Sequence, residues 1–215
     1  NTIELTVFSG DKKPYMYKSK AYKRNDTATV EVDRAELTRL ILAGSNMHYE
    51  ELPAENQKLT FRELEKRLIA ETGIDRCDIN ILKTLNLYSD KDGYNIAAAL
   101  LADSNNYPGI DIGRFGESIS VIRKRKTLDN ISILAEYEAA CEIFRDYYQY
   151  EIIEGSLRKT KELIPEEAFR ETVANALIHR VWDVREQIRV FMFEDRIEVY
   201  SPGGLPEELS KEEYL

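Results

Sequence analysis

The sequence predicts a mixed α+β protein, on three observations. Short segments rich in β-branched and aromatic residues alternate with turn formers near the N-terminus. Longer segments carry apolar residues at steps of three and four, which is typical of amphipathic helices. Residues 187–204 form two runs of alternating polarity joined by a tight turn, the pattern of a β-hairpin. At 215 residues, 43% of them hydrophobic, the chain is long enough to bury a substantial core.

The N-terminal part is expected to be a β-meander followed by a helix. Residues 2–10, 14–24 and 27–32 have strand composition and are separated by turn formers. In "DRAELTRLILAG", Asp33 is placed to cap a helix that ends at Gly44. The polar residues that follow indicate a linker, which we place at 46–57.

The next segment, 58–105, is expected to be helical. "LTFRELEKRLIAETG" predicts a helix with Thr60 as N-cap and Glu63 completing a capping box. A second helix, the turn "SDKDG" and another apolar segment follow, which resembles half of a winged-helix unit. Small helical subdomains without any role in DNA binding show the same pattern, so both interpretations stay open here.

The C-terminal half alternates strands and helices. "GIDIGRF" and "ESISVIRKRK" are expected to be strands, residues 129–150 a long helix, and 151–163 a strand. Pro165 then opens another helix, since proline is favoured in a first helical turn.

Charge and cysteine content exclude several classes of protein. The net charge of −9 gives no general attraction to nucleic acid. Local basic segments exist, however: "RKRK" at 123–126, and an N-terminal group in which we select four candidate DNA contacts, Lys18, Lys20, Lys23 and Arg24. Two cysteines far apart argue against a zinc site or a disulfide framework and fit a reducing cytoplasm.

The chain shows no sign of a membrane or secretory segment. No apolar run approaches the length of a transmembrane helix, and the first residues lack the pattern of a signal peptide. We therefore expect a cytoplasmic protein with no membrane partner. The sequence also starts without Met and already with strand-like residues, so we expect it to begin inside a longer protein.

The helical segment "FRETVANALIHR" (169–180) is the first candidate site. Glu171, Asn175 and His179 are four residues apart and would form one row on a helix face. Taken alone, such a row is also what the solvated face of any amphipathic helix shows. His179 is more often a helix residue bonded to a backbone carbonyl, and Arg180 suits a helix C-terminus without further role.

The hairpin after this helix ends in "SPGGLP", where Gly203 and Gly204 let backbone approach a ligand closely. A carboxylate and an amide facing such a turn could hold Mg²⁺ and a nucleotide phosphate, because Mg²⁺ prefers oxygen ligands. Glu171 could then act as a general base toward water.

These residues resemble a known family. "EEAFRETVANALIHRVW" followed by "IRVFMFEDRIEVYSPGGLPEEL" is similar to the C-terminal region of bacterial predicted transcriptional regulators, the helicase-related or Schlafen-type AlbA-like DNA-binding proteins. "PYMYKSKAYKRNDTATVEVDRAELTRLI" looks like the end of that family's AlbA-like domain. The resemblance implies an AlbA-like part at 1–45 and, at 106–215, an α/β sandwich like the ATPase fold of gyrase B, MutL and histidine kinases, truncated at its C-terminus.

The resemblance also implies roles for single residues. Glu171 would be the general base, Asn175 a Mg²⁺ ligand, and Gly203 and Gly204 part of the ATP-binding turn. The family's ATPase fold carries there an Asp that binds adenine, but this chain has Tyr200 or Ser201 instead. "HRVW" also replaces the usual "HRDY", and the chain stops at Leu215 before any second glycine-rich motif.

Two functions follow as hypotheses. The first is a DNA-binding transcriptional regulator whose degenerate or incomplete nucleotide-binding domain serves assembly, including homo-oligomers, or ligand sensing, with no ATP turnover. The alternative is a Mg-ATP-dependent ATPase that acts in DNA metabolism. The missing carboxylate at Tyr200 or Ser201 favours the first hypothesis.

Overall fold

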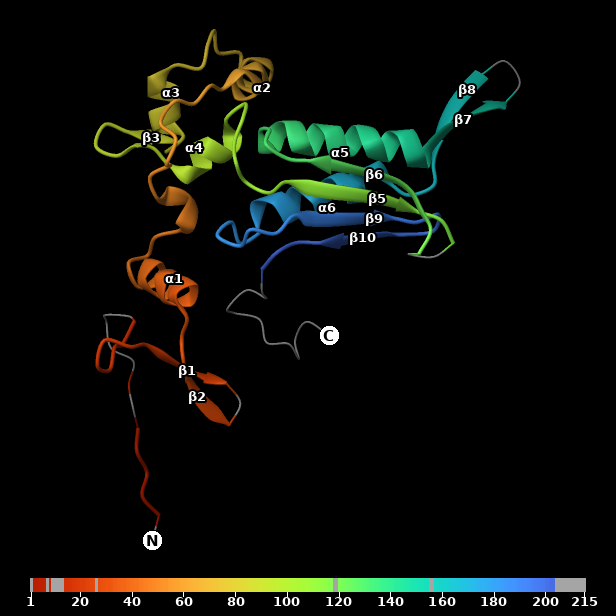
Figure 1. Ribbon diagram of the computed structural model, residues 1–215. Coiled ribbons are helices and arrows are strands. Elements are labelled where there is room, and N and C mark those ends of the chain that lie inside the picture. The colour runs from red at the N-terminus through yellow and green to blue at the C-terminus, as the bar shows by residue number, and fades with distance from the viewer. Residues whose placement is uncertain are drawn as a thin grey trace. The chain divides into compact units, whose positions relative to one another are not determined.

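The computed structural model confirms a mixed α+β fold and describes residues 2–6, 8, 14–25, 27–117, 120–154 and 157–203. The chain divides into two compact units, Asn1–Leu52 and Pro53–Leu215 (Figure 1). Each unit is considered by itself below. None of the helices in the described ranges is long and apolar enough to cross a membrane.

The first unit contains one hairpin and one helix. Strands β1 (Tyr22–Asn25) and β2 (Ala28–Glu31) pair antiparallel, and α1 (Arg34–Gly44) follows. Asp33 caps α1 as expected, because its side chain accepts a hydrogen bond from the backbone N–H of Glu36 at 2.8 Å. No residue of α1 is buried.

The predicted three-stranded meander is wrong. Residues 2–6 form no strand, and Ile3 and Leu5 are almost fully exposed. β-Branched composition favours extended backbone, but a strand also needs a partner for its backbone hydrogen bonds. Among the described residues of the first unit, β1 and β2 are the strands that pair. The segment expected as a linker is partly ordered, since η1 (Tyr49–Glu51) lies in it and Ala54 is buried.

The second unit begins with a small helical segment. It contains α2 (Arg62–Thr72), α3 (Ile79–Thr84), the short hairpin of β3 (Tyr88–Ser89) and β4 (Gly93–Tyr94), and α4 (Ile96–Leu101). These elements enclose a core cluster of their own. Its fully buried members are Leu64, Leu82, Leu87 and Ala98.

The predicted capping box at Thr60 is wrong. Helix α2 starts one residue later, after Phe61, which makes no side-chain cap. A carboxylate distant in sequence takes this role instead: Asp103 Oδ1 accepts from the N–H of Glu63 at 3.1 Å. The Asp103 N–H in turn donates to the Thr60 carbonyl at 2.8 Å, so the cap also anchors the end of α4 to the start of α2.

The rest of the second unit is built around a four-stranded sheet, in the order β10-β9-β5-β6. Strand β5 (Ile110–Phe115) pairs parallel with β9 (Ile188–Met192) and antiparallel with β6 (Ile122–Leu128), while β9 pairs antiparallel with β10 (Ile197–Tyr200). Both predicted strands and the predicted C-terminal hairpin are thus present.

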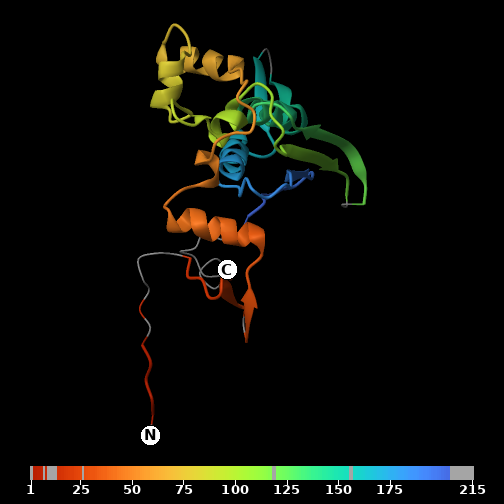
Figure 2. The same cartoon turned by 60° about the vertical axis from the view of Figure 1, so that its left-hand side comes forward.

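Helices α5 (Ile133–Tyr148) and α6 (Glu166–Ile178) pack on one face of this sheet (Figures 1 and 2). The core between them is made of alternate residues of β5 and β9 and of the inner helix faces, with Phe144 stacked on Phe169 at 4.6 Å between ring centroids. Residues 151–163 do not make one strand: β7 (Gln149–Glu154) and β8 (Leu157–Glu162) form a hairpin of their own.

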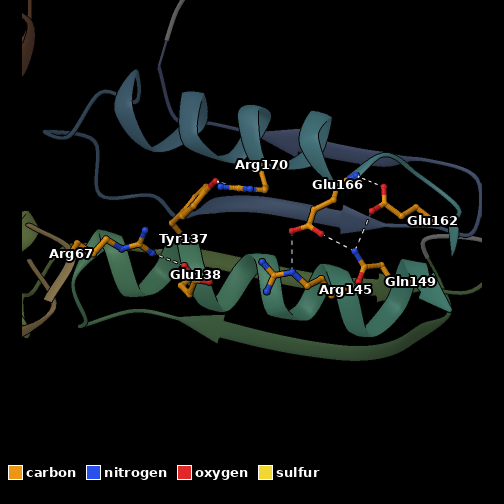
Figure 3. Close-up of polar contacts among 8 residues, drawn as sticks. All are labelled: Arg67, Tyr137, Glu138, Arg145, Gln149, Glu162, Glu166 and Arg170. Atoms are coloured by element: carbon orange, nitrogen blue, oxygen red, sulfur yellow. Dashed lines mark hydrogen bonds and ion pairs between the residues drawn. The ribbon is translucent and has the colours of Figure 1, made fainter. Parts of the chain in front are cut away.

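Polar contacts hold α6 against α5 (Figure 3). Arg145 of α5 donates to Glu166 of α6 at 2.9 Å, and Gln149 donates to the same carboxylate at 2.7 Å. One turn along α6, Arg170 donates to the Tyr137 hydroxyl at 3.0 Å. These contacts fix the rotation of α6 about its axis, and therefore which of its residues face outward.

Candidate functional site

The candidate site lies on the outer face of α6. Pro165 occupies the N-cap position, one residue before the first helical turn in which it was expected. Four residues of α6 are buried against the sheet and α5, namely Phe169, Val173, Ala176 and Leu177. The polar row Glu171, Asn175 and His179 is exposed on the opposite side, as the spacing predicts.

The row offers oxygen ligands for a hard cation but does not form a complete coordination shell. No group of three or more His, Cys, Asp or Glu side chains suited to a metal occurs in the part of the chain that the structure describes. The site offers one carboxylate and one amide, which fits Mg²⁺ because that ion usually keeps several waters and takes one or two protein oxygens. His179 ends the helix, with its N–H on the Asn175 carbonyl at 2.9 Å.

The segment after β10 lies against the C-terminal end of α6. The Ser201 hydroxyl donates to the Ala176 carbonyl at 3.0 Å, and the Val181 N–H donates to the Pro202 carbonyl at 2.9 Å. Gly203 has a φ of 152°, and a β-carbon there would come within 3.1 Å of the Val181 side chain. Gly204, the second predicted glycine, lies outside the described residues.

The structure separates the two residues considered in place of the adenine-binding Asp. Tyr200 is 52% exposed, packs on Phe191 and donates to Glu198 at 3.0 Å, so it lies on the sheet face away from the helices. Ser201 is the next residue and bonds α6, so it lies on the helix side. The residue on the helix side therefore carries a hydroxyl that is already engaged with α6.

Arg180 has a role that the sequence did not suggest. It is 3% exposed, and its guanidinium donates to the carbonyls of Pro108 at 2.7 Å and Glu186 at 2.5 Å. It also stacks over the Trp182 ring at 4.3 Å. Our prediction that the helix macrodipole suffices for Arg180 is wrong, because this side chain ties the end of α6 to the starts of β5 and β9.

A second buried ionisable group, Glu136 of α5, lies in the same region and is 1% exposed. Burial raises the pKa of Glu136 to about 8, which Arg180 opposes and Asp129 increases. Gly109 leaves room for it, since a β-carbon at that position would collide with the Glu136 carboxyl. A signal was present in the sequence: Glu136 falls one turn before Ala140 and two before Phe144, on the helix's core face.

The four predicted N-terminal cations are not equivalent. Lys20 pairs with Glu31 at 2.6 Å and Lys23 with Glu36 at 2.7 Å, so a carboxylate partly neutralises each. Lys18 lies over its neighbouring Tyr17 ring at 5.3 Å, and Arg24 contacts Thr29 at 3.4 Å. The hairpin is therefore less basic than its sequence suggests.

Comparison with known proteins supports part of the resemblance. A family model described as "Putative ATP-dependent DNA helicase recG C-terminal" matches residues 185–215, a range that contains β9 and β10. No curated protein matches the chain significantly. Neither this match nor the structural one below names an AlbA-like domain.

One solved structure with the same fold is the DIP2311 protein from Corynebacterium diphtheriae. It superposes with a TM-score of 0.66 at 22% identity over 90% of this chain. The chain spans only 41% of the length of that protein. At this identity the likeness concerns the fold alone.

Proposed function

We propose that this chain is part of a DNA-associated regulatory protein whose C-terminal domain, residues 106–215, binds a magnesium–adenine nucleotide. In this proposal residues 1–45 are an AlbA-like part, 46–57 a linker and 58–105 a winged-helix-like segment. The observation that carries the proposal is the pair of hydrogen bonds that joins Ser201 and Pro202 to the end of α6. They join the C-terminal end of α6, the helix that carries the exposed Glu171 and Asn175, to a turn that contains Gly203.

The residues have distinct roles in this proposal. Asn175 supplies an amide oxygen to the metal, and Gly203 allows backbone to approach the nucleotide. The bound metal would neutralise phosphate charge. Because the helix-facing position after β10 is Ser201 and not a carboxylate, we expect weak recognition of the adenine amino group and a sensing role without turnover.

The test is Mg-ATP binding by the full-length protein, measured by calorimetry with and without Mg²⁺. Asn175→Ala is expected to weaken Mg²⁺-dependent binding at least about tenfold, equal to about 1.4 kcal/mol, while Glu171→Gln keeps it. Glu167→Gln, an exposed change on the same helix, is the control and should bind as the parent does. If the parent protein gives no heat with Mg-ATP, the nucleotide-binding proposal fails.

The second candidate is ATP hydrolysis. Among the described residues Glu171 has no ion pair or hydrogen-bond partner, so its carboxylate is available to accept a proton from water. Steady-state release of phosphate that disappears in Glu171→Gln, with binding retained, would establish this activity. Turnover equal in parent and variant would exclude Glu171 as the base.

A further inference from the structure

A small cleft between β6 and α5 is lined by three cations. Arg114, Lys124 and Lys126 converge there from two neighbouring strands, beside Tyr147 and Asp146 of α5. We propose that this cleft binds phosphate groups of a nucleic-acid strand. The cleft lies at the β6 edge of the sheet, whereas the candidate nucleotide site is at the β10 edge, so the inference does not depend on the proposed nucleotide site (Figure 1).

The basic run 123–126 divides into two kinds of residue. Arg125 lies on the sheet face away from the helices, where it makes a two-pronged contact with Asp111 at 2.8–3.0 Å. Arg123 pairs with Glu194 at 3.1 Å. These two arginines are therefore already neutralised by carboxylates.

The two lysines of the run point to the other face. Because side chains alternate along a strand, Lys124 and Lys126 lie on the side of α5. Within the described part of the chain neither has a carboxylate partner, although Asp146 lines the same cleft. Lys124 Nζ and the Arg114 guanidinium lie 5.8 Å and 4.4 Å from the centroid of the Tyr147 ring. Positive charge is thus in excess in the cleft.

The arrangement works against the stability of the sheet. Arg114 and Lys124 are directly opposite each other in the β5–β6 ladder, and like charges in that position are destabilising. The Tyr147 ring relieves part of the repulsion through its electron-rich face. A local arrangement that costs stability is typical of a functional site, and here the missing partner is an anion.

The dimensions of the cleft accommodate a phosphate group. The cleft has a volume of about 70 Å³, enough for several water molecules, and so for one phosphate group. Lys124 and Lys126 are two residues apart, about 7 Å along the strand. That is the order of spacing between successive phosphates of an extended strand, so the two lysines could contact neighbouring phosphates.

The experiment measures binding of a labelled single-stranded oligonucleotide to the full-length protein by fluorescence anisotropy, between about 50 and 200 mM salt. In Lys124→Gln/Lys126→Gln we expect affinity at least about tenfold lower, and a log–log salt slope shallower by about 1.4, because about 0.7 is lost per phosphate contact. The control is Lys58→Gln/Lys66→Gln, which removes the same charge at two exposed lysines outside the cleft and should bind as the parent does. Thermal unfolding checks that both variants fold.

Each other result would overturn the inference. An unchanged affinity and slope in the β6 variant would show that the cleft takes no part. Loss of binding only in a Lys20→Gln/Lys23→Gln variant would place the contact in the N-terminal hairpin. Inorganic phosphate is the second probe, and its binding is monitored through the NMR chemical shifts of the cleft residues. If it binds there while the oligonucleotide does not, the ligand is a free phosphate and not a nucleic acid.

Discussion

Two buried ionisable side chains, Glu136 and Arg180, lie under the end of α6 that carries the candidate site. The Arg180 guanidinium donates to three backbone carbonyls from two segments, which a lysine could not do because it lacks the planar fork, while its Nε has no hydrogen-bond partner among the described residues. Glu136 keeps one oxygen without a hydrogen-bond partner among the described residues. Because burial raises the pKa of Glu136, this carboxyl makes the region sensitive to protonation.

Glu136 should make stability depend on pH. Folded Glu136 keeps its proton up to a pKa of about 8, against about 4.5 when unfolded, with Arg180 and Asp129 as the charged groups that influence it. The folded state therefore binds more protons in this window, and the free energy of unfolding falls as pH rises, by up to about 1.4 kcal/mol per pH unit. Glu136→Gln should remove this fall.

Urea unfolding of parent and variant at several pH values between about 5 and 8 measures the effect. Glu142→Gln, an exposed change on the same helix, is the control and should keep the parent's pH profile. Parallel profiles for the parent and Glu136→Gln would contradict the prediction.

At the scale of elements, the helices and strands that the sequence predicted correctly are those marked by a pattern in neighbouring residues. Helices α5 and α6 and the hairpin β9–β10 follow from periodicity, and Asp33 from capping chemistry. The errors come from interactions between distant residues. Whether residues 2–6 form a strand depends on a partner, and the N-terminus of α2 is capped by Asp103, which no local pattern at Thr60 could reveal.

The same division holds for the candidate site. The row of Glu171 and Asn175 is a matter of helical spacing and was predictable. The contact of Ser201 with the Ala176 carbonyl was not, because it depends on how β10 packs beside α6. The pairing of Arg114 with Lys124 needed the strand register, although both residues had already been assigned to strands.

The cap of α2 gives a prediction at this scale. Burial alone would raise the pKa of Asp103, but hydrogen bonds from the Thr60 hydroxyl and from the N–H groups of Arg62 and Glu63 outweigh it and lower the pKa. Asp103→Ala is expected to cost about 1 kcal/mol, the usual effect of losing an N-cap. Urea unfolding measures it, and Asp103→Asn should lose less because an amide oxygen can still accept. Equal stability of parent and Asp103→Ala would show that the cap is dispensable.

At the scale of the whole molecule, the two units differ in how much they bury. The second unit has two hydrophobic clusters, whereas in the first only Ala21 and Val32 are buried among the described hydrophobic residues. A two-stranded hairpin with one helix that buries nothing is marginally stable in water. Local stability increases with the number of buried contacts. Amide hydrogens before Leu52 should therefore exchange faster than those after it.

Hydrogen exchange of the intact chain, followed by mass spectrometry of its peptides, tests this division. Peptides from β1, β2 and α1 should exchange quickly, and those from β5, β9 and α5 slowly, because the latter form the main core. Peptides from α2 and α4 should fall between, since their cluster is smaller. Exchange in α1 as slow as in α5 would mean that contacts beyond its own hairpin stabilise the first unit.

The same measurement applies to the cleft between β6 and α5. An added oligonucleotide should slow amide exchange in β6 if this cleft binds it.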